Sequence, residues 1–252
     1  MISKWLLFPC PKPNAKHRLF CFPYAGGGNQ TYYNWTKYLP ENVELVIIQP
    51  PGRGARLNES RYTTMHDLVA NLLAHFTLFI DKPYTIIGHS LGSRVGFELI
   101  NQLHQRKLPL PQNFFASGSK GPHQAPREKT SFDLPEHEFK EELRKLSGTP
   151  NEILKNDELM QLILPIIRAD FQIADTYRFN MKCKFPIRAF VFGGLEDAIT
   201  HSEYKSWFQF FESSGEPTMF DGDHFFIDRQ GPSVVQEIAK VITPSYESSS
   251  AF

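Results

Sequence analysis

The serine best suited to act as a nucleophile lies in the segment Gly88–Gly92, whose sequence is G-H-S-L-G. The segment follows the apolar run Tyr84–Ile87 and precedes a helical pattern, which is the context that a G-x-S-x-G motif requires. A serine on so sharp a strand-to-helix turn needs glycine two residues away on each side, because Cβ atoms would collide there. The motif therefore predicts Ser90 as a nucleophile for acyl transfer. The alternative is a glycine-rich turn that carries an incidental serine.

A serine hydroxyl is a weak nucleophile at neutral pH and needs a general base. On a turn of this kind, an acid and then a histidine follow the serine along the chain. Of the nine histidines, only His201 and His224 lie after the last inserted segment. His224 comes in the turn after the final predicted strand, so we expect it to be the base. His201 begins a polar helix and is better explained as a surface residue.

The third residue of such a triad orients the imidazole and stabilises its cation. Asp197 lies just past the predicted strand Ile187–Phe192 and is our prediction for this acid. Glu196 is its nearest rival. Asp223 is adjacent to His224 in the chain, so it is poorly placed to reach the Nδ1 atom of that ring.

An oxyanion hole needs two backbone N–H groups that point at the developing negative charge. The residue after the serine, Leu91, supplies one of them. The loop after the first long predicted strand, Pro23–Gly28, contains three glycines that let the backbone approach a substrate closely, so the second donor is Ala25 or Gly26. The alternative, a phosphate-binding loop, would require a G-x-x-x-x-G-K pattern followed by serine or threonine, which this loop lacks.

The elements that must position these residues alternate between strands and helices. Short apolar runs bounded by glycine, proline or asparagine predict buried strands at 18–22, 44–48, 84–88, 113–118, 187–193 and 216–220. Apolar residues spaced by three and four predict helices at 65–80, 91–105, 135–146, 157–177, 201–211 and 232–241. Thr64 is a candidate cap for the first of these helices. The alternation favours an α/β fold with a mostly parallel sheet and helices on both faces.

Residues from about 121 to 178 contain two of the predicted helices and no strand signal. We expect them to form a helical lid inserted in a single domain that spans residues 1–252, because the chain returns to the same sheet afterwards. The polar loop Gly121–Thr130 is a candidate hinge for this lid. The serine-containing tail, residues 245–252, is predicted to be disordered.

The composition excludes several classes of protein. The chain of 252 residues carries 27 basic and 27 acidic side chains, so it is not a nucleic-acid binder that relies on overall charge. Its three cysteines form no CxxC or Cys/His cluster, which gives neither a zinc signature nor a disulfide framework. No apolar run is long enough for a signal peptide or a membrane helix. We therefore expect a cytoplasmic protein.

Several segments resemble the type II thioesterases of the α/β-hydrolase superfamily, the free-standing editing enzymes of polyketide and nonribosomal peptide assembly lines. The medium-chain thioesterase of fatty acid synthase is a relative of this group. The resemblance covers nearly the whole chain. The segment F-P-Y-A-G-G-G at 22–28 is similar to the family's F-P-x-A-G-G. The other segments that carry the resemblance are 49–56, 88–92, 164–171, 194–197 and 222–225.

The resemblance implies an α/β-hydrolase fold with Ser90 as nucleophile, His224 as base and Asp197 as acid, and with Ala25 and Leu91 as the oxyanion donors. It implies hydrolysis of acyl thioesters on the phosphopantetheine arm of acyl or peptidyl carrier proteins, through an acyl-serine intermediate. Such carrier proteins are the expected partners, without nucleic acid or membrane. No organic cofactor and no metal is implied, and we expect a monomer.

Two departures from the family pattern concern the segment around the nucleophile. Leu91 replaces a methionine, which does not change a backbone donor, and the pair Ser93 and Arg94 replaces small and variable residues. The sequence leaves open whether Arg94 faces solvent or a neighbouring loop.

Four further charged residues have two interpretations. In the favoured one they are structural: Arg168 and Asp170 tie down the lid helix, and Arg53 and Arg56 hold the loop after the second predicted strand. In the other interpretation, these residues bind an acidic carrier protein or the phosphopantetheine phosphate. The forked guanidinium group of arginine suits the binding of such anionic groups.

The triad alone does not define the substrate, because one set of side chains serves many acyl transfers. A small-molecule esterase, lipase or acyltransferase is therefore the second hypothesis. A third, from another class, is a catalytically silent protein that binds an acyl ligand or a carrier protein. Against it, a silent site has no chemical need for serine, acid and histidine together.

Overall fold

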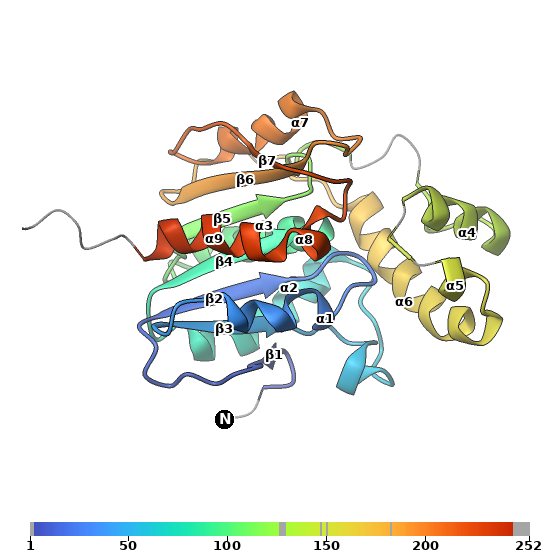
Figure 1. Ribbon diagram of the computed structural model, residues 1–252, viewed down its shortest axis with the longest axis horizontal. Helices are drawn as coiled ribbons and strands as arrows, with labels where there is room; N and C mark the ends of the chain where they lie inside the picture. The colour runs from blue at the N-terminus through green and yellow to red at the C-terminus, as the bar shows by residue number, and fades with distance from the viewer. Residues whose placement is uncertain (1–2, 126–129, 147, 150, 182, 244–252) are drawn as a thin grey trace, which may run out of the picture.

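The chain forms a seven-stranded sheet in the order β1-β3-β2-β4-β5-β6-β7 (Figure 1). The computed structural model describes residues 3–125, 130–146, 148–149, 151–181 and 183–243. Only β1 runs antiparallel to its neighbour, and the other pairs are parallel. The strands are β1 (Leu6–Leu7), β2 (His17–Phe22), β3 (Val43–Ile48), β4 (Tyr84–His89), β5 (Asn113–Ser117), β6 (Arg188–Gly194) and β7 (Thr218–Phe220). The predicted α/β fold is confirmed.

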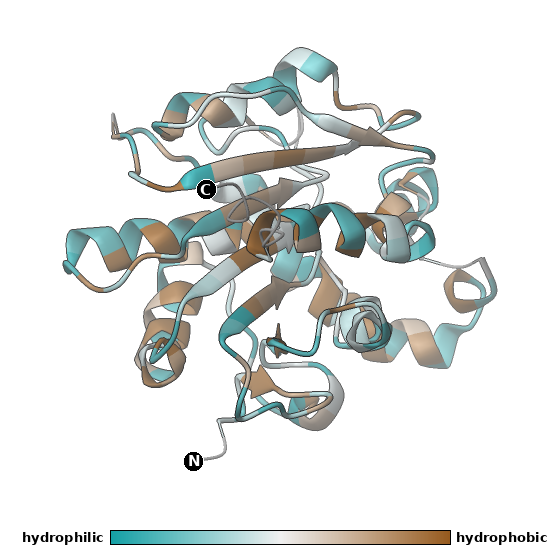
Figure 2. Ribbon diagram, turned by 60° about the vertical axis from the view of Figure 1, so that its left-hand side comes forward, coloured by the Kyte–Doolittle hydropathy of each residue, from teal (hydrophilic) through white to brown (hydrophobic). Residues whose placement is uncertain are grey.

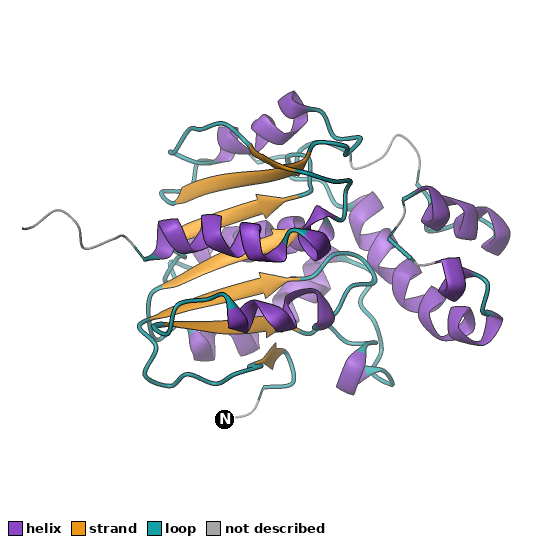
Figure 3. Cartoon of the chain, in the orientation of Figure 1, coloured by secondary structure: helices purple, strands orange, loops and turns teal. Residues whose placement is uncertain are grey.

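Helices cover both faces of the sheet (Figure 3). One face carries α1 (Gln30–Tyr33), α8 (Phe226–Arg229) and α9 (Gly231–Ile242), and the opposite face carries α2 (Met65–Phe76) and α3 (Leu91–Gln105). Each layer buries its own apolar cluster against the sheet. Because both faces are covered, strands β2, β3, β4 and β5 are buried along their whole length, and Figure 2 shows them as largely hydrophobic.

Helix α2 forms where the apolar spacing predicts it. Its six buried side chains recur at intervals of one, three and four residues, which places them on the face toward the sheet. The predicted cap is present, because Thr64 Oγ1 accepts a hydrogen bond from the Asp67 N–H at 3.2 Å. This bond satisfies one of the N–H groups that the first turn leaves without an intrahelical acceptor.

The differences from the prediction concern short elements. The strand β1 and the single-turn helices α1, α5 (Asn151–Leu154) and α8 have too few residues to show a periodic pattern. The predicted helix at 201–211 is α7 (His201–Lys205) followed by a 3-10 turn (Ser206–Phe210), and the strand predicted at 216–220 begins at Thr218.

Between β5 and β6 the chain leaves the sheet and forms α4 (Glu136–Lys145), α5 and α6 (Asp157–Thr176), beyond the carboxyl ends of the strands (Figure 1). We call these three helices the lid. They share an apolar cluster that is separate from the two sheet clusters and is built from Phe139, Leu143, Leu154, Met160, Leu164, Ile167 and Phe171. The tail predicted to be disordered, residues 245–252, lies outside the described residues.

Candidate active site

Ser90 lies at the sharp turn between β4 and α3, with φ 53° and ψ −116°. The close approach of backbone segments explains both glycines of the motif. A Cβ atom on Gly88 would lie 2.2 Å from the carbonyl carbon of Gly92, and one on Gly92 would lie 2.1 Å from the carbonyl oxygen of Phe22. The Ser90 N–H donates to the Ser117 carbonyl at 2.7 Å, which fixes the strained turn to the end of β5.

The structure brings the three predicted triad side chains together. His224 Nε2 lies 3.0 Å from Ser90 Oγ, and His224 Nδ1 lies 2.8 Å from Asp197 Oδ2. Asp197 follows β6, and His224 follows β7, so each side chain comes from the carboxyl end of a different strand. This chain of hydrogen bonds has the geometry in which a carboxylate orients an imidazole that takes the proton of a serine.

Asp197 is held by more than the histidine. Tyr204 donates its hydroxyl proton to Asp197 Oδ2 at 2.6 Å, and the Ile199 N–H donates to Oδ1 at 3.2 Å. Burial acts to raise the pKa of Asp197, but the hydrogen bonds from His224, Tyr204 and Ile199 outweigh it and hold this pKa below its ordinary value. The carboxylate is therefore charged at neutral pH, although only 4% of its side chain is exposed.

The rival residues lie elsewhere. Glu196 is exposed, and Asp223 accepts a hydrogen bond from the Phe225 N–H at 2.9 Å. His201 is an exposed residue whose Nε2 lies 3.7 Å from Glu216. Among the described residues, it is Asp197 that bonds to His224 and His224 that bonds to Ser90, so the geometry favours Asp197 and His224 over these three.

His89 is a buried residue of the site that sequence reasoning missed. Its Nε2 lies 2.8 Å from the carbonyl oxygen of His224, and its Nδ1 lies 2.8 Å from Ser117 Oγ. A carbonyl only accepts, so Nε2 carries the proton and the Ser117 hydroxyl donates to Nδ1. Burial, reinforced by His224, lowers the pKa of His89 to about 3, which keeps the ring neutral. The one available signal was its position directly before Ser90.

The structure distinguishes the two candidates for the second oxyanion donor. The Gly26 N–H donates to Asp170 Oδ2 at 2.7 Å, so it is occupied. Among the described residues, no hydrogen bond uses the N–H of Ala25, and Leu91 is the first residue of α3, where an N–H has no intrahelical acceptor. The geometry therefore leaves Ala25 and Leu91 as the candidate donors for an oxyanion.

The buried arginines contact the protein itself. Arg53 pairs with Asp170 at 2.8 Å, and Arg56 pairs with Glu59 at 2.7 Å and donates to the Gln49 carbonyl at 2.9 Å. These contacts agree with the structural interpretation of the two residues.

Arg168 and Arg94 also bind backbone. Arg168 donates to the Phe132 carbonyl at 2.6 Å and lies over the Phe139 ring, so it ties the lid together. Arg94, whose direction the sequence left open, is 1% exposed and donates to the carbonyl of Gln124 at 2.9 Å. Arg94 thus faces the start of the segment predicted to be a hinge; residues 126–129 of that segment lie outside the described residues.

A cleft of about 1000 Å³ lies between the lid and the loop Tyr24–Asn29. Ala25 and Phe225 line it on the side of the triad. The lid contributes an apolar wall to the cleft, which consists of Leu143, Leu146, Ile153, Ile163, Ile166, Ile167 and Phe171. Such a wall suits an acyl chain better than a charged ligand.

Two further features concern the part of the chain that the structure describes. It contains no group of three or more His, Cys, Asp or Glu side chains placed to hold a metal ion. Within the same residues, no helix combines the length and the apolar character needed to cross a membrane.

Comparison with known proteins decides the family. A model of the thioesterase domain matches residues 17–242. The chain belongs to the thioesterase family. This thioesterase is 33% identical over 241 residues to the gramicidin S biosynthesis protein GrsT of Aneurinibacillus migulanus, an alignment that covers 95% of this chain and 94% of GrsT.

Solved structures agree with this assignment. The structure of ClbQ, from the colibactin NRPS/PKS pathway, superposes with a TM-score of 0.85 and 33% identity, over 90% of this thioesterase and 97% of ClbQ. The structure of the type II thioesterase BorB, from the borrelidin biosynthetic cluster, superposes with a TM-score of 0.84 and 26% identity. The alignment covers 94% of this thioesterase and 96% of BorB. The predicted resemblance to type II thioesterases is thus confirmed, as is the prediction of a serine thioesterase with the α/β-hydrolase fold.

Proposed function

We propose that this thioesterase removes acyl or peptidyl chains from the phosphopantetheine arm of carrier proteins, in nonribosomal peptide, polyketide or fatty acid biosynthesis. The observation that carries the proposal is the chain of hydrogen bonds from Asp197 through His224 to Ser90, together with a cleft to which the lid contributes an apolar wall. Support for the pathway comes from GrsT, named for gramicidin S biosynthesis, and from ClbQ, assigned to an NRPS/PKS pathway.

In the first half of the proposed reaction, His224 Nε2 takes the proton of Ser90 as Oγ attacks the thioester carbonyl. The N–H groups of Ala25 and Leu91 stabilise the negative charge on the carbonyl oxygen. The carbon–sulfur bond then breaks, and the leaving thiolate takes the proton from His224. A thiol with a pKa of about 8.5 leaves more readily than an alkoxide, so the site does not need a strong general acid.

In the second half, a water molecule attacks the acyl-serine ester. His224 takes a proton from the water, the same two N–H groups hold the second oxyanion, and Ser90 Oγ leaves with that proton. The products are the free acid and the unchanged enzyme. Asp197 stays ionised throughout and orients the imidazole, in agreement with its lowered pKa.

The test is a hydrolysis panel of acyl-pantetheine thioesters, acyl carrier proteins and matched oxygen esters. We expect thioester hydrolysis that is faster on the carrier protein and is lost in Ser90→Ala. The matched control is Ser202→Ala, which removes an exposed serine on α7 and should leave the rate unchanged. Hydrolysis of oxygen esters alone would instead indicate an esterase, and undiminished turnover by Ser90→Ala would contradict the proposed nucleophile.

A further inference from the structure

The loop that carries Ala25 is held by a side chain of the lid. Asp170, on α6, accepts a hydrogen bond from the Gly26 N–H at 2.7 Å through Oδ2, and it pairs with Arg53 at 2.8 Å through Oδ1. Arg53 in turn donates to the Gly27 carbonyl at 2.9 Å. Asp170 and Arg53 are only 7% and 9% exposed. Two buried charges thus bind the Gly26 N–H and the Gly27 carbonyl, just after Ala25, and one of these charges belongs to the lid.

Within the loop, one backbone hydrogen bond, from the Gly27 N–H to the Tyr24 carbonyl at 2.9 Å, closes a turn over Ala25 and Gly26, and the contacts with Asp170 and Arg53 add to it. Three consecutive glycines follow Ala25, and Gly26 has a φ of +75°, which glycine adopts at little cost. The Gly26 N–H belongs to the peptide that joins Ala25 to Gly26, so the bond to Asp170 sets the orientation of the residue whose own N–H would bind the oxyanion. A fixed donor stabilises a transition state without reorganising during the reaction.

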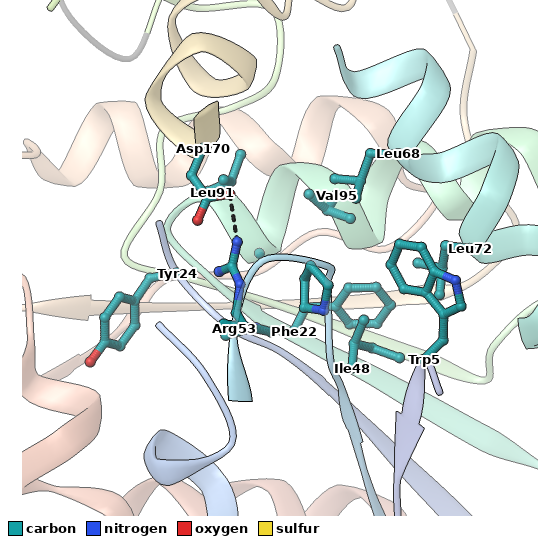
Figure 4. Close-up of a pocket in the computed structure, with 13 residues that line it drawn as sticks. Trp5, Phe22, Tyr24, Ile48, Arg53, Leu68, Leu72, Leu91, Val95 and Asp170 are labelled. Atoms are coloured by element: carbon teal, nitrogen blue, oxygen red, sulfur yellow. Dashed lines mark hydrogen bonds and ion pairs between the residues drawn. The ribbon is translucent and has the colours of Figure 1, made fainter. Parts of the chain in front are cut away.

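A second contact between α6 and the loop lies one turn away from Asp170. A Cβ atom on Gly26 would lie 3.0 Å from Ile167 Cγ1, so this part of the helix packs directly on the loop. Figure 4 shows the Arg53–Asp170 pair at the edge of a small cavity that Leu91 also lines. The pair therefore lines the same cavity as Leu91 and bonds to the residue that follows Ala25.

We propose that Asp170 and Arg53 are positioning residues of the oxyanion hole, through which closure of the lid completes the catalytic site. When α6 lies on the loop, the carboxylate holds the Ala25–Gly26 peptide and thereby fixes Ala25, whose own N–H is the proposed oxyanion donor. When α6 moves away, the loop loses this hydrogen bond and the Ala25 donor is no longer fixed. The inference rests on the proposed function, since it assumes that Ala25 binds the oxyanion formed after attack by Ser90.

The test compares two inhibitors on the whole enzyme. A trifluoromethyl ketone analogue of an acyl-pantetheine forms a tetrahedral adduct with Ser90 that carries the oxyanion, whereas the corresponding thioether without a carbonyl binds only as a ground-state mimic. For Asp170→Asn we expect the inhibition constant of the ketone to rise about ten- to a hundred-fold, somewhat less than for outright loss of a donor. The constant of the thioether should change by less than about three-fold, and kcat should fall while KM stays nearly constant.

The matched control is Asp175→Asn. Asp175 is also buried on α6, but it accepts its hydrogen bonds from Ser131 and Phe132, away from the loop. This variant should lose stability without changing the ratio of the two inhibition constants. Arg53→Lys keeps the charge but removes the fork that reaches both Asp170 and Gly27, so it should raise the ratio by a smaller factor. It serves as the second variant if Asp170→Asn does not fold.

An equal rise of both inhibition constants, or no change in either, would overturn the inference. So would a change in ratio that Asp175→Asn reproduces. Failure of the proposed function is distinguishable, because the wild-type enzyme would then bind the ketone no more tightly than the thioether, and Ser90→Ala would bind the ketone as well as the wild type.

Discussion

At the carboxyl edge of the sheet, the side chains proposed for catalysis are joined by hydrogen bonds to one another and to the backbone, whereas the lid is held mainly by an apolar cluster of its own. Ser90, His89 and Asp197 each have a hydrogen-bond partner on another segment of the chain, which for Asp197 includes Tyr204 on α7. On the outer surface of α4, ion pairs such as Lys145–Glu142 are exposed, and pairs of this kind contribute little to stability.

The comparison separates two tasks. Acyl transfer needs fixed donors and a fixed base, which the edge of a parallel sheet can supply because the ends of several strands meet there. Binding of an acyl chain, under the proposed function, needs an apolar wall, and the lid residues that line the cleft form one. The Asp170–Arg53 pair is a polar connection between the two regions. Substitutions at the sheet edge should therefore alter the chemical step, and substitutions in the lid should alter which acyl chains are selected. Substitutions in the pair should alter both.

The largest effect is expected for Asp197→Asn. The amide keeps the size of the side chain but loses the charge that orients and stabilises the imidazole cation, so kcat should fall about 10³- to 10⁴-fold with little change in KM. Steady-state hydrolysis of an acyl-pantetheine thioester measures this. Glu196→Gln is the control, since Glu196 is exposed and adjacent in the chain. A similar loss in both variants would mean that the acid has been assigned wrongly.

His89→Phe should have the next largest effect. The ring keeps its volume, but the carbonyl of His224 and the hydroxyl of Ser117 lose their partner, so we expect kcat to fall about ten- to a hundred-fold. The unfolding free energy in urea should drop by about 1–3 kcal/mol.

His17→Phe is the matched control for His89→Phe. His17 is also buried and bonds to Thr85 at 2.9 Å, but it lies at the start of β2, away from the active site. It should lose stability and keep its kcat. Unchanged kcat in His89→Phe would show that the base does not depend on this buried ring.

A change in the lid should alter selection rather than chemistry. Ile163 lines the cleft, so Ile163→Trp narrows it and should lower kcat/KM for long acyl chains about tenfold, while the value for an acetyl thioester changes little. Leu162 is 49% exposed and is not part of the cleft wall, which makes Leu162→Trp the control. An equal loss for long and short chains would contradict the division of tasks.

The smallest effect is expected for Tyr204→Phe. Without the phenol, Asp197 loses a donor and its pKa rises relative to the wild type, so the carboxylate attracts the imidazole cation more strongly. The acid limb of the profile of kcat/KM against pH should move to higher pH by about half a unit. Tyr84→Phe removes a buried phenol that donates to the Pro109 carbonyl, away from the triad, and should leave the profile in place. A shift to lower pH would contradict the argument.

Much of this architecture could be predicted from residue patterns. Helix α2 has a clear apolar period, β4 coincides with a short apolar run, and the G-x-S-x-G spacing reflects a close backbone approach that only glycine permits. The three proposed triad residues follow from chain order, because each comes after a strand whose carboxyl end lies at the same edge of the sheet.

Other features depend on contacts between distant segments. The choice between Ala25 and Gly26 rested on Asp170, which is more than a hundred residues away and has no sequence signal for its partner. The hydrogen bond from His89 to the His224 carbonyl is likewise a long-range contact within a motif already assigned to the nucleophile. Single-turn helices such as α5 and α8 are set by packing rather than by periodicity.

The most direct test of the central claim is to capture the acyl-enzyme. The enzyme is mixed rapidly with excess acyl-pantetheine thioester, quenched in acid, and analysed by intact mass and peptide mapping. The account predicts a mass increase equal to one acyl group, located on the peptide that contains Ser90 and absent from Ser90→Ala. An acyl group on another residue, or full turnover by Ser90→Ala, would contradict it.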